Sequence, residues 1–147
     1  MSPGRLVVGV LLAAAMAVAI GSSGLAGETR QAFEIDIRWS HFTPAVLRVP
    51  AGVPVRIVLI NHDPIDHEWI VGDEAVHAAH RTGSEPSHGI RATEQSIPAG
   101  GRVETIDPAG GRVETIVTFA GPGSLAFICH LPGHEAYGMS GRLVVVD

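Results

Sequence analysis

The chain contains one cysteine, and it lies close to two other residues that can bind a metal. Cys129, His134 and Met139 form the pattern C-x4-H-x4-M. A thiolate, an imidazole and a thioether make a soft ligand set, which suits copper that cycles between Cu(I) and Cu(II). Zinc can also use cysteine and histidine, but it gains little from a thioether. The residue types and their spacing therefore favour copper.

A copper site of this kind needs one further imidazole from a separate part of the fold. Two histidines and the cysteine then form a trigonal plane, with methionine as a weak axial ligand. His67 is the candidate, because it follows the turn after Asn61 and directly precedes the strand-like segment EWIV. His62 is the alternative, since it directly ends a predicted strand. If Cys129 and Met139 were only buried apolar residues, the spacing and the distant histidine would have no explanation.

Short strands separated by glycine and proline turns are predicted on both sides of these residues. Apolar residues alternate in FEIDIRW, and the other candidate strands are VPVRIVLIN, HEWIV, RVETIVTF, SLAFIC and GRLVVV. Residues 72–95 contain few large apolar side chains and are expected to form a surface loop with room for one short helix. If RVETIVTF and SLAFIC pair as a hairpin, the start of the first strand lies at the metal end. The pattern predicts an all-β sandwich or barrel.

Two segments resemble the cupredoxins, the family of small blue copper proteins. They are VPAGVPVRIVLINHDPIDHEWIV and GSLAFICHLPGHEAYGMSGRLVVV, and the metal loop is most similar to rusticyanin-like and sulfocyanin-like members. The resemblance implies a cupredoxin-like Greek-key sandwich or barrel as the domain of residues 27–147, and it favours His67 over His62. It implies one type 1 copper ion bound by His67, Cys129, His134 and Met139. In the family, the asparagine at position 61 helps to hold the cysteine loop by hydrogen bonding.

The metal loop also resembles the end of multicopper oxidases, where H-C-H-x3-H-x4-M links a blue copper to a three-copper cluster. Ile128 stands where the first histidine of that motif would be, and the chain has no H-x-H pair. An oxygen-reducing cluster would therefore have too few ligands, and we expect that the protein is not an enzyme. His130 is expected to be a solvent-facing remnant or a hydrogen-bonding residue.

Three further histidines lie in the long loop-like stretch. His77 and His80 share one face if their segment is helical, and His88 lies nearby. A second copper or zinc site is one interpretation of these residues. Solvated loop histidines are far commoner, and that is the preferred interpretation.

Four protein ligands leave no open position for a substrate, so electrons are expected to pass through the site but atoms are not. We therefore predict an electron carrier that docks redox protein partners transiently near His134. The neighbours of this histidine are mostly apolar or small: Leu131, Pro132, Ala136, Tyr137 and Gly138. The alternative is a copper-trafficking or copper-resistance protein of the cell envelope that uses the same ligands.

Residues 1–26 have the layout of a secretory signal peptide. An apolar run over residues 6–20 follows Arg5, and small residues precede a cleavage site near Ala26. The polar residues 21–23 favour cleavage, whereas an uncleaved anchor is the alternative and the only predicted contact with a membrane. The protein is thus expected to be exported to the periplasm or the cell exterior.

The composition excludes several classes of function. The net charge is -5, and the ten basic residues, all arginines, do not cluster, so nucleic acid is not an expected partner. The absence of lysine excludes Schiff-base chemistry and a P-loop. A single cysteine in an exported protein cannot form an internal disulfide.

One sequence repeat occurs in the chain. PAGGRVETI occupies residues 98–106 and again residues 108–116. The offset of ten residues is even, so either copy presents the same side chains to the same face of a sheet. We expect one copy to form the strand and the other to form a hairpin or loop without a functional role.

Overall fold

The computed structural model describes residues 31–84, 91–100 and 111–147. The expected signal peptide, His88 and part of the duplicated segment lie outside these residues. Within the described part of the chain, no helix is long and apolar enough to cross a membrane.

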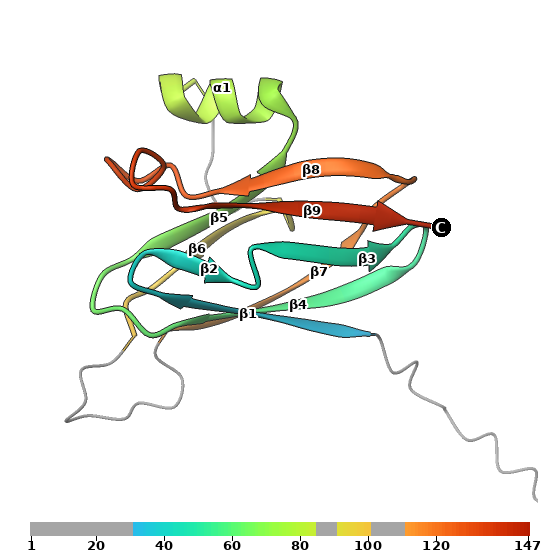
Figure 1. Cartoon of the computed structure of the whole chain (residues 1–147), viewed down its shortest axis with the longest axis horizontal. Coiled ribbons are helices and arrows are strands. Elements are labelled where there is room, and N and C mark those ends of the chain that lie inside the picture. The colour runs from blue at the N-terminus through green and yellow to red at the C-terminus, as the bar shows by residue number, and fades with distance from the viewer. Residues whose placement is uncertain (1–30, 85–90, 101–110) are drawn as a thin grey trace, which may run out of the picture.

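The described residues form a sandwich of two β-sheets with one helix beside it (Figure 1). In chain order, the elements are β1 (Ala32–Arg38), β2 (His41–Thr43), β3 (Val46–Pro50), β4 (Pro54–Asn61), β5 (His67–Gly72), α1 (Glu74–Thr82), β6 (Glu94–Ile97), β7 (Arg112–Thr118), β8 (Gly123–Ile128) and β9 (Ser140–Val146). One sheet has the order β2-β1-β4-β7, and the other has the order β3-β9-β8-β5-β6. β1 pairs with β4 and β3 with β9 in parallel, whereas the remaining pairs are antiparallel. The predicted all-β sandwich is confirmed.

The core lies between the two sheets and follows the alternation of apolar residues along the strands. Ile35 and Ile37 of β1 are fully buried, and the other sheet contributes the fully buried Trp69 and Phe127. The ring of Phe127 meets that of Phe42 edge to face, with the ring centroids 5.2 Å apart. Burying each large apolar side chain stabilises the fold by about 1.5–3 kcal/mol. This shared core fixes the positions of the strand ends that carry the metal ligands.

Each of the six strands predicted from the sequence is present, with ends that agree to within one residue. The hairpin considered for β7 and β8 does not form, because β7 pairs with β4 in one sheet and β8 pairs with β5 and β9 in the other. The glycine and proline turn between β7 and β8 carries the chain from one sheet to the other. The start of β7 still lies at the metal end, since the backbone N–H of Asn61 donates to the carbonyl of Gly111 at 2.6 Å.

Helix α1 occupies part of the stretch that was expected to be a loop with at most a short helix. The side chain of Asp73 caps its first turn by accepting from the N–H of Val76. Gly83 ends the helix in the left-handed conformation at φ 66°, where glycine is favoured. The helix lies beside β8, on the side of the five-stranded sheet that faces away from β1 and β4 (Figure 1).

Candidate metal centre

Three of the predicted ligands meet at one end of the sandwich. His67 begins β5, Cys129 follows the last residue of β8, and His134 lies in the loop between β8 and β9. Their ligand atoms all lie within 4.8 Å of one another. The Nδ1 atoms of His67 and His134 are 3.2 Å apart, and Sγ of Cys129 is 3.2 Å from Nδ1 of His134. His67 and Cys129 are buried, whereas His134 is partly exposed.

Met139 closes the loop that contains Cys129 and His134. It is fully buried and belongs to the same apolar core cluster as Cys129. The N–H of Cys129 donates to the carbonyl of Met139 at 3.2 Å, and the N–H of Met139 donates to the carbonyl of His134 at 3.0 Å. The backbone therefore brings all three loop residues of the C-x4-H-x4-M pattern together. The role of the thioether as axial ligand stays a prediction.

A buried carboxylate orients the ring of His67. Oδ2 of Asp63 lies 3.0 Å from Nε2 of His67, and the carboxylate also accepts the backbone N–H groups of Trp39 at 2.7 Å and Ser40 at 2.8 Å. With its Nε2 facing a carboxylate, His67 carries its proton on that atom and keeps the lone pair of Nδ1 for a metal. Such a partner fixes both the tautomer and the direction of a ligating imidazole.

The electrostatic surroundings set the charge of Asp63 and His67. Burial opposes ionisation of Asp63, but the hydrogen bonds from Ser40, Trp39 and His67 outweigh it and lower the pKa of the carboxyl below 3.8. Burial lowers the pKa of His67 below 6.5, against the opposing effect of Asp63. A charged carboxylate thus faces a neutral imidazole, which is the protonation state that a metal requires.

The thiol of Cys129 lies in a dry environment. Burial raises the pKa of this thiol above 9.0, although the backbone N–H groups of Glu68 and Leu131 act in the opposite direction. The N–H of Glu68 lies 3.3 Å from Sγ and donates to it. A soft metal ion that binds here must displace the thiol proton, so metal binding releases a proton.

Asn61 supports the site in a different way from the one expected. Its side-chain amide donates to the carbonyls of Ile65 at 2.8 Å and Pro98 at 3.0 Å, and its Oδ1 accepts the N–H of Asp63 at 2.9 Å. The expectation that it holds the cysteine loop is therefore wrong. It shapes the turn over residues 62–66 that presents Asp63 and His67, because it sits where that turn leaves β4.

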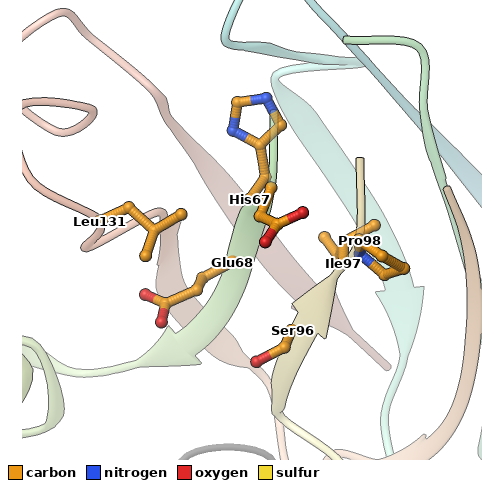
Figure 2. A pocket seen from close by; sticks show the side chains of 7 residues that line it. His67, Glu68, Ser96, Ile97, Pro98 and Leu131 are labelled. Atoms are coloured by element: carbon orange, nitrogen blue, oxygen red, sulfur yellow. The ribbon is translucent and has the colours of Figure 1, made fainter. Parts of the chain in front are cut away.

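A pocket of about 230 Å³ opens beside His67. Figure 2 shows His67 above it, with Glu68 and Leu131 on one side and Ile97 and Pro98 on the other. Asp66 and Glu68 contribute two carboxylates to its lining. The pocket is therefore a mostly apolar recess with two carboxylates in its wall, next to a candidate metal ligand.

The other histidines are placed partly against expectation. His62 pairs with Asp36 at 2.6 Å on the surface, so it is not in the metal centre. His77 and His80 are buried residues of α1 rather than solvated loop residues. His130 is not solvent-facing: its side chain is only 3% exposed and its Nε2 lies 3.0 Å from Nδ1 of His77, as the hydrogen-bonding alternative expected. Tertiary packing of the helix on the metal loop excludes water from these rings.

The donor set of the site fits a type 1 copper centre. The buried thiol of Cys129 converges with the Nδ1 atoms of the buried His67 and the partly exposed His134. The buried Met139 ends the same loop. Cysteine, two histidines and methionine are the ligands of blue copper sites. The cluster of His67, Cys129, His134 and Met139 is consistent with one type 1 copper ion.

Comparisons with known proteins agree with this geometry. The chain is 30% identical over 153 aligned positions to the copper-resistant cuproprotein CopI of Pseudomonas aeruginosa, which covers 86% of this chain and 82% of that protein. It is 34% identical over 104 positions to CopI of Rubrivivax gelatinosus, over 71% of this chain but 59% of that protein. Auracyanin A, a blue copper protein from Chloroflexus aurantiacus, is similar with a TM-score of 0.56 and 27% identity, over 78% of this chain and 98% of that one. A family model for the cupredoxin-like domain matches residues 10–145. The chain therefore belongs to the cupredoxin-like family and is a non-enzymatic copper-binding protein.

Proposed function

We propose that the protein is an exported copper-resistance protein that binds copper ions in the cell envelope at His67, Cys129, His134 and Met139. The observation that carries this proposal is the similarity to CopI of Pseudomonas aeruginosa over most of both chains. Export rests on the signal-like residues 1–26. Binding in the envelope would lower the free copper concentration there, and this lowering is the proposed basis of resistance.

The site has features that suit the capture of a soft cation. The thiol of Cys129 is buried and accepts a hydrogen bond from the N–H of Glu68. The ring of His67 is buried too and is held by the hydrogen bond from its Nε2 to Asp63. Asp66 and Glu68 line the recess next to His67, and carboxylates raise the local concentration of cations. We infer that this recess is the access route for the ion.

The roles of the protein groups follow from their contacts. Asp63 orients the imidazole of His67, Asn61 shapes the turn that holds both residues, and the backbone of the loop brings Cys129 and Met139 together. When bound, copper would supply a one-electron redox couple at this position. The apolar core around Cys129 excludes water from the thiolate.

A growth experiment tests the resistance function. The full chain and its Cys129→Ser variant would be expressed in a bacterium that lacks its own envelope copper defence. We expect the wild type to raise the copper concentration that stops growth and Cys129→Ser to lose most of that gain. The surface variant His41→Gln is the control, because the side chain of His41, within the described structure, bonds only to the carbonyl of Trp39. Equal growth of wild type and empty vector would contradict the proposal.

Electron transfer is the second candidate function, and one observation favours it. Three large apolar side chains are exposed at the metal end: Trp39 is 80% exposed, Tyr137 is 79% exposed and Ile65 is 46% exposed. Trp39 bonds through its N–H to Asp63, and Tyr137 lies in the loop of His134, so both surround the site. Exposed aromatic side chains beside a redox centre suit brief docking of a redox protein.

A kinetic comparison separates the two functions. We expect Trp39→Ala and Tyr137→Ala to slow electron exchange with a small cytochrome while the visible spectrum stays unchanged. Val53→Ala is the matched control, since Val53 is 47% exposed and precedes β4 at the far end of that strand. If the wild type exchanges no electrons but restores growth on copper, resistance alone remains.

A further inference from the structure

Helix α1 contacts the metal loop at two residues, and each directly follows a predicted copper ligand. His130 follows Cys129, and Glu135 follows His134. A shift of either contact residue is passed to the neighbouring ligand through a single peptide unit, which is planar and stiff. The helix is therefore placed to influence where two of the ligands stand.

The contact at Glu135 is a fork of hydrogen bonds from Arg81 of α1. Nη2 of Arg81 donates to Oε1 of Glu135 at 2.7 Å, and Nε lies 3.0 Å from both carboxylate oxygens. Nη1 donates to Glu74 of the same helix at 2.7 Å, so the guanidinium is also held on its own side. Single surface ion pairs contribute little, but a carboxylate that binds two nitrogens of one arginine is held in a defined geometry.

The contact at His130 is made by imidazole rings of the same helix. Nε2 of His130 lies 3.0 Å from Nδ1 of His77, and the ring stacks on that of His80 with the centroids 5.4 Å apart. Nδ1 of His130 also lies 3.3 Å from Glu135. His77 and Arg81 are four residues apart, so one face of α1 makes both contacts. Among the described residues, the copper site is the only group of convergent metal ligands, so these rings pack and do not form a second such group.

His134 is the ligand that most needs support from outside its loop. His67 and Cys129 are buried, whereas His134 is partly exposed. The ring of His67 is fixed by Asp63, but within the described structure the ring of His134 has hydrogen-bond geometry only with the two other ligands. Its position therefore depends on the backbone of the loop, which Arg81 holds at the next residue.

We propose that Arg81 is a positioning residue of the copper site: through Glu135 it keeps His134 in place and thereby slows the loss of copper. Release begins when one ligand leaves the ion, and water reaches the partly exposed imidazole most easily. If the loop stays fastened to α1, the detached imidazole remains close to the ion and binds again. The proposal rests on copper binding at the proposed ligands, whichever of the two functions that binding serves.

The competing explanation is that Arg81 and Glu135 only attach α1 to the sandwich. The pair would then affect the stability of the folded protein but not the release of copper well below the melting temperature. The two explanations also differ in how variants combine. If Arg81 acts through Glu135, removing both side chains should have no more effect on release than removing either one.

The experiment measures copper release from four full-length proteins: the wild type, Arg81→Ala, Glu135→Ala and the double variant. Each protein would be loaded with CuSO4, reduced with ascorbate and mixed with rising concentrations of the Cu(I) chelator bathocuproine disulfonate. The rate that no longer rises with chelator reports spontaneous release. We expect this rate to be about 10-fold higher in all three variants, at the lower end of the 10–100-fold that outer partners of ligands contribute to affinity.

Two further measurements separate positioning from attachment. EPR spectra of the oxidised proteins should show a changed copper hyperfine splitting in Arg81→Ala, because His134 takes a different position. Arg81→Lys keeps the charge but loses the planar fork, so it should release copper at an intermediate rate. Arg56→Ala is the matched control with no expected change, since Arg56 is also partly exposed and donates to a carboxylate, Glu114, but lies in the other sheet.

Thermal melts of the metal-free proteins show whether each variant is folded at the temperature of the measurement. If Arg81→Ala is not folded there, Arg81→Lys and Glu135→Ala carry the test. An unchanged release rate in a folded, copper-loaded variant would overturn the proposal alone, as would effects that multiply in the double variant. A wild type that shows no intense visible band with copper would contradict the copper site itself and the proposal with it.

Discussion

At the scale of single residues, the copper site depends on the direction of the ring of His67. That direction is set by Asp63, which also accepts two N–H groups from the β1–β2 turn. Trp39 and Ser40 in this turn have positive φ values of 56° and 53° although neither is glycine. The carboxylate therefore couples an unusual turn to the orientation of a metal ligand.

The first prediction concerns this carboxylate. Asp63→Asn keeps the size of the side chain but removes its charge, so His67 loses a strong partner and its preferred tautomer. We expect the affinity for copper to fall about 10–100-fold, as is typical when such an outer partner is lost. Competition with a chelator of known affinity measures the change. Asp36→Asn is the control, because Asp36 pairs with the surface residue His62, and an equal loss there would contradict the account.

The ligands could be predicted from sequence, whereas their supporting residues could not. Cys129, His134 and Met139 lie in one short loop, so their spacing alone brings them together. Asp63 acts only because the turn at Trp39 and Ser40 comes close to it in space, and nothing in the local sequence predicts that contact. The prediction for Asn61 failed for the same reason, since its partners include the distant Pro98.

At the scale of elements, the β8–β9 hairpin sets the distance between the two ends of the metal loop. Ile128 pairs with Ser140, so Cys129 and Met139 continue the ladder. One step further, Phe127 pairs with Gly141, and its ring covers the position where a side chain on Gly141 would stand. The hairpin therefore needs a glycine under this aromatic ring.

The second prediction follows from that close approach. In Gly141→Ala, the new Cβ would lie 2.1 Å from ring atoms of Phe127 and 2.8 Å from the carbonyl of Ala45, so the core must shift. We expect the free energy of unfolding to fall by about 1–3 kcal/mol, as overpacking usually costs. Urea denaturation measures this value. Gly123→Ala in the same hairpin has no atom within 4 Å of its Cβ and should change stability far less; equal effects would refute the explanation.

The third prediction concerns the ion pair that joins α1 to the metal loop. Hydrogen bonds from Arg81 are the main reason that the pKa of Glu135 lies below its usual 4.5. A carboxyl with a lowered pKa in the folded state stabilises the protein at neutral pH, and this contribution disappears as the pH falls through the lowered pKa. Metal-free wild type should therefore melt at a higher temperature than Glu135→Gln at pH 7.

The pH dependence of that difference is the test. Thermal melts from pH 7 downward should show the two melting temperatures converging as the pH falls below about 4. Glu114→Gln is the control, since Glu114 pairs with Arg56 and Arg112 on the exposed face of the other sheet. A difference between wild type and Glu135→Gln that stays constant across this range would rule out an electrostatic origin.

The elements that could be predicted are the ones with long apolar alternation. β1, β4 and β9 have this pattern and were predicted to within one residue at each end. β2, β3 and β6 were missed because they have only three, five and four residues, too few to show a clear period. α1 was underestimated because its buried face consists of histidines rather than aliphatic residues.

At the scale of the whole molecule, the pairing of β5 with β8 brings together ligands that are 62 positions apart in the chain, at His67 and Cys129. His67 is reached from β4 of one sheet and begins β5 of the other, so its turn bridges both layers. A metal ion bound by His67 and Cys129 joins two neighbouring strands of one sheet at the point where the chain arrives from the other sheet. Unfolding the sandwich must therefore break the site.

The fourth prediction is that copper stabilises the entire domain. A ligand that binds only the folded state raises stability by about 4 kcal/mol when its free concentration is 1,000 times Kd. The melting temperature of the wild type should rise with copper concentration, and Cys129→Ser should lose most of this rise. Differential scanning calorimetry with and without a chelator makes the measurement. A melting temperature that does not respond to copper would show that the ion does not bind the folded domain at this junction.

The class of the fold could be predicted because several short strands with alternating patterns leave few alternatives to a sandwich. The pairing of β7 could not, because the sequence does not show that this strand lies beside the distant β4 and not beside the next strand in the chain. Residues Arg112–Thr118 form β7, so the second copy of PAGGRVETI supplies the strand. Cleavage of residues 1–26 stays a prediction that N-terminal sequencing of the exported protein would check.

The central claim is that Cys129, together with His67 and His134, binds copper as a type 1 site. The visible absorption and EPR spectra of the copper-loaded wild type and of Cys129→Ser test it most directly. We predict an intense visible band with a narrow copper hyperfine splitting in the wild type, reversibly lost on reduction and absent from Cys129→Ser. A wild-type spectrum without that band, or a band that survives the loss of the thiol, would contradict the account.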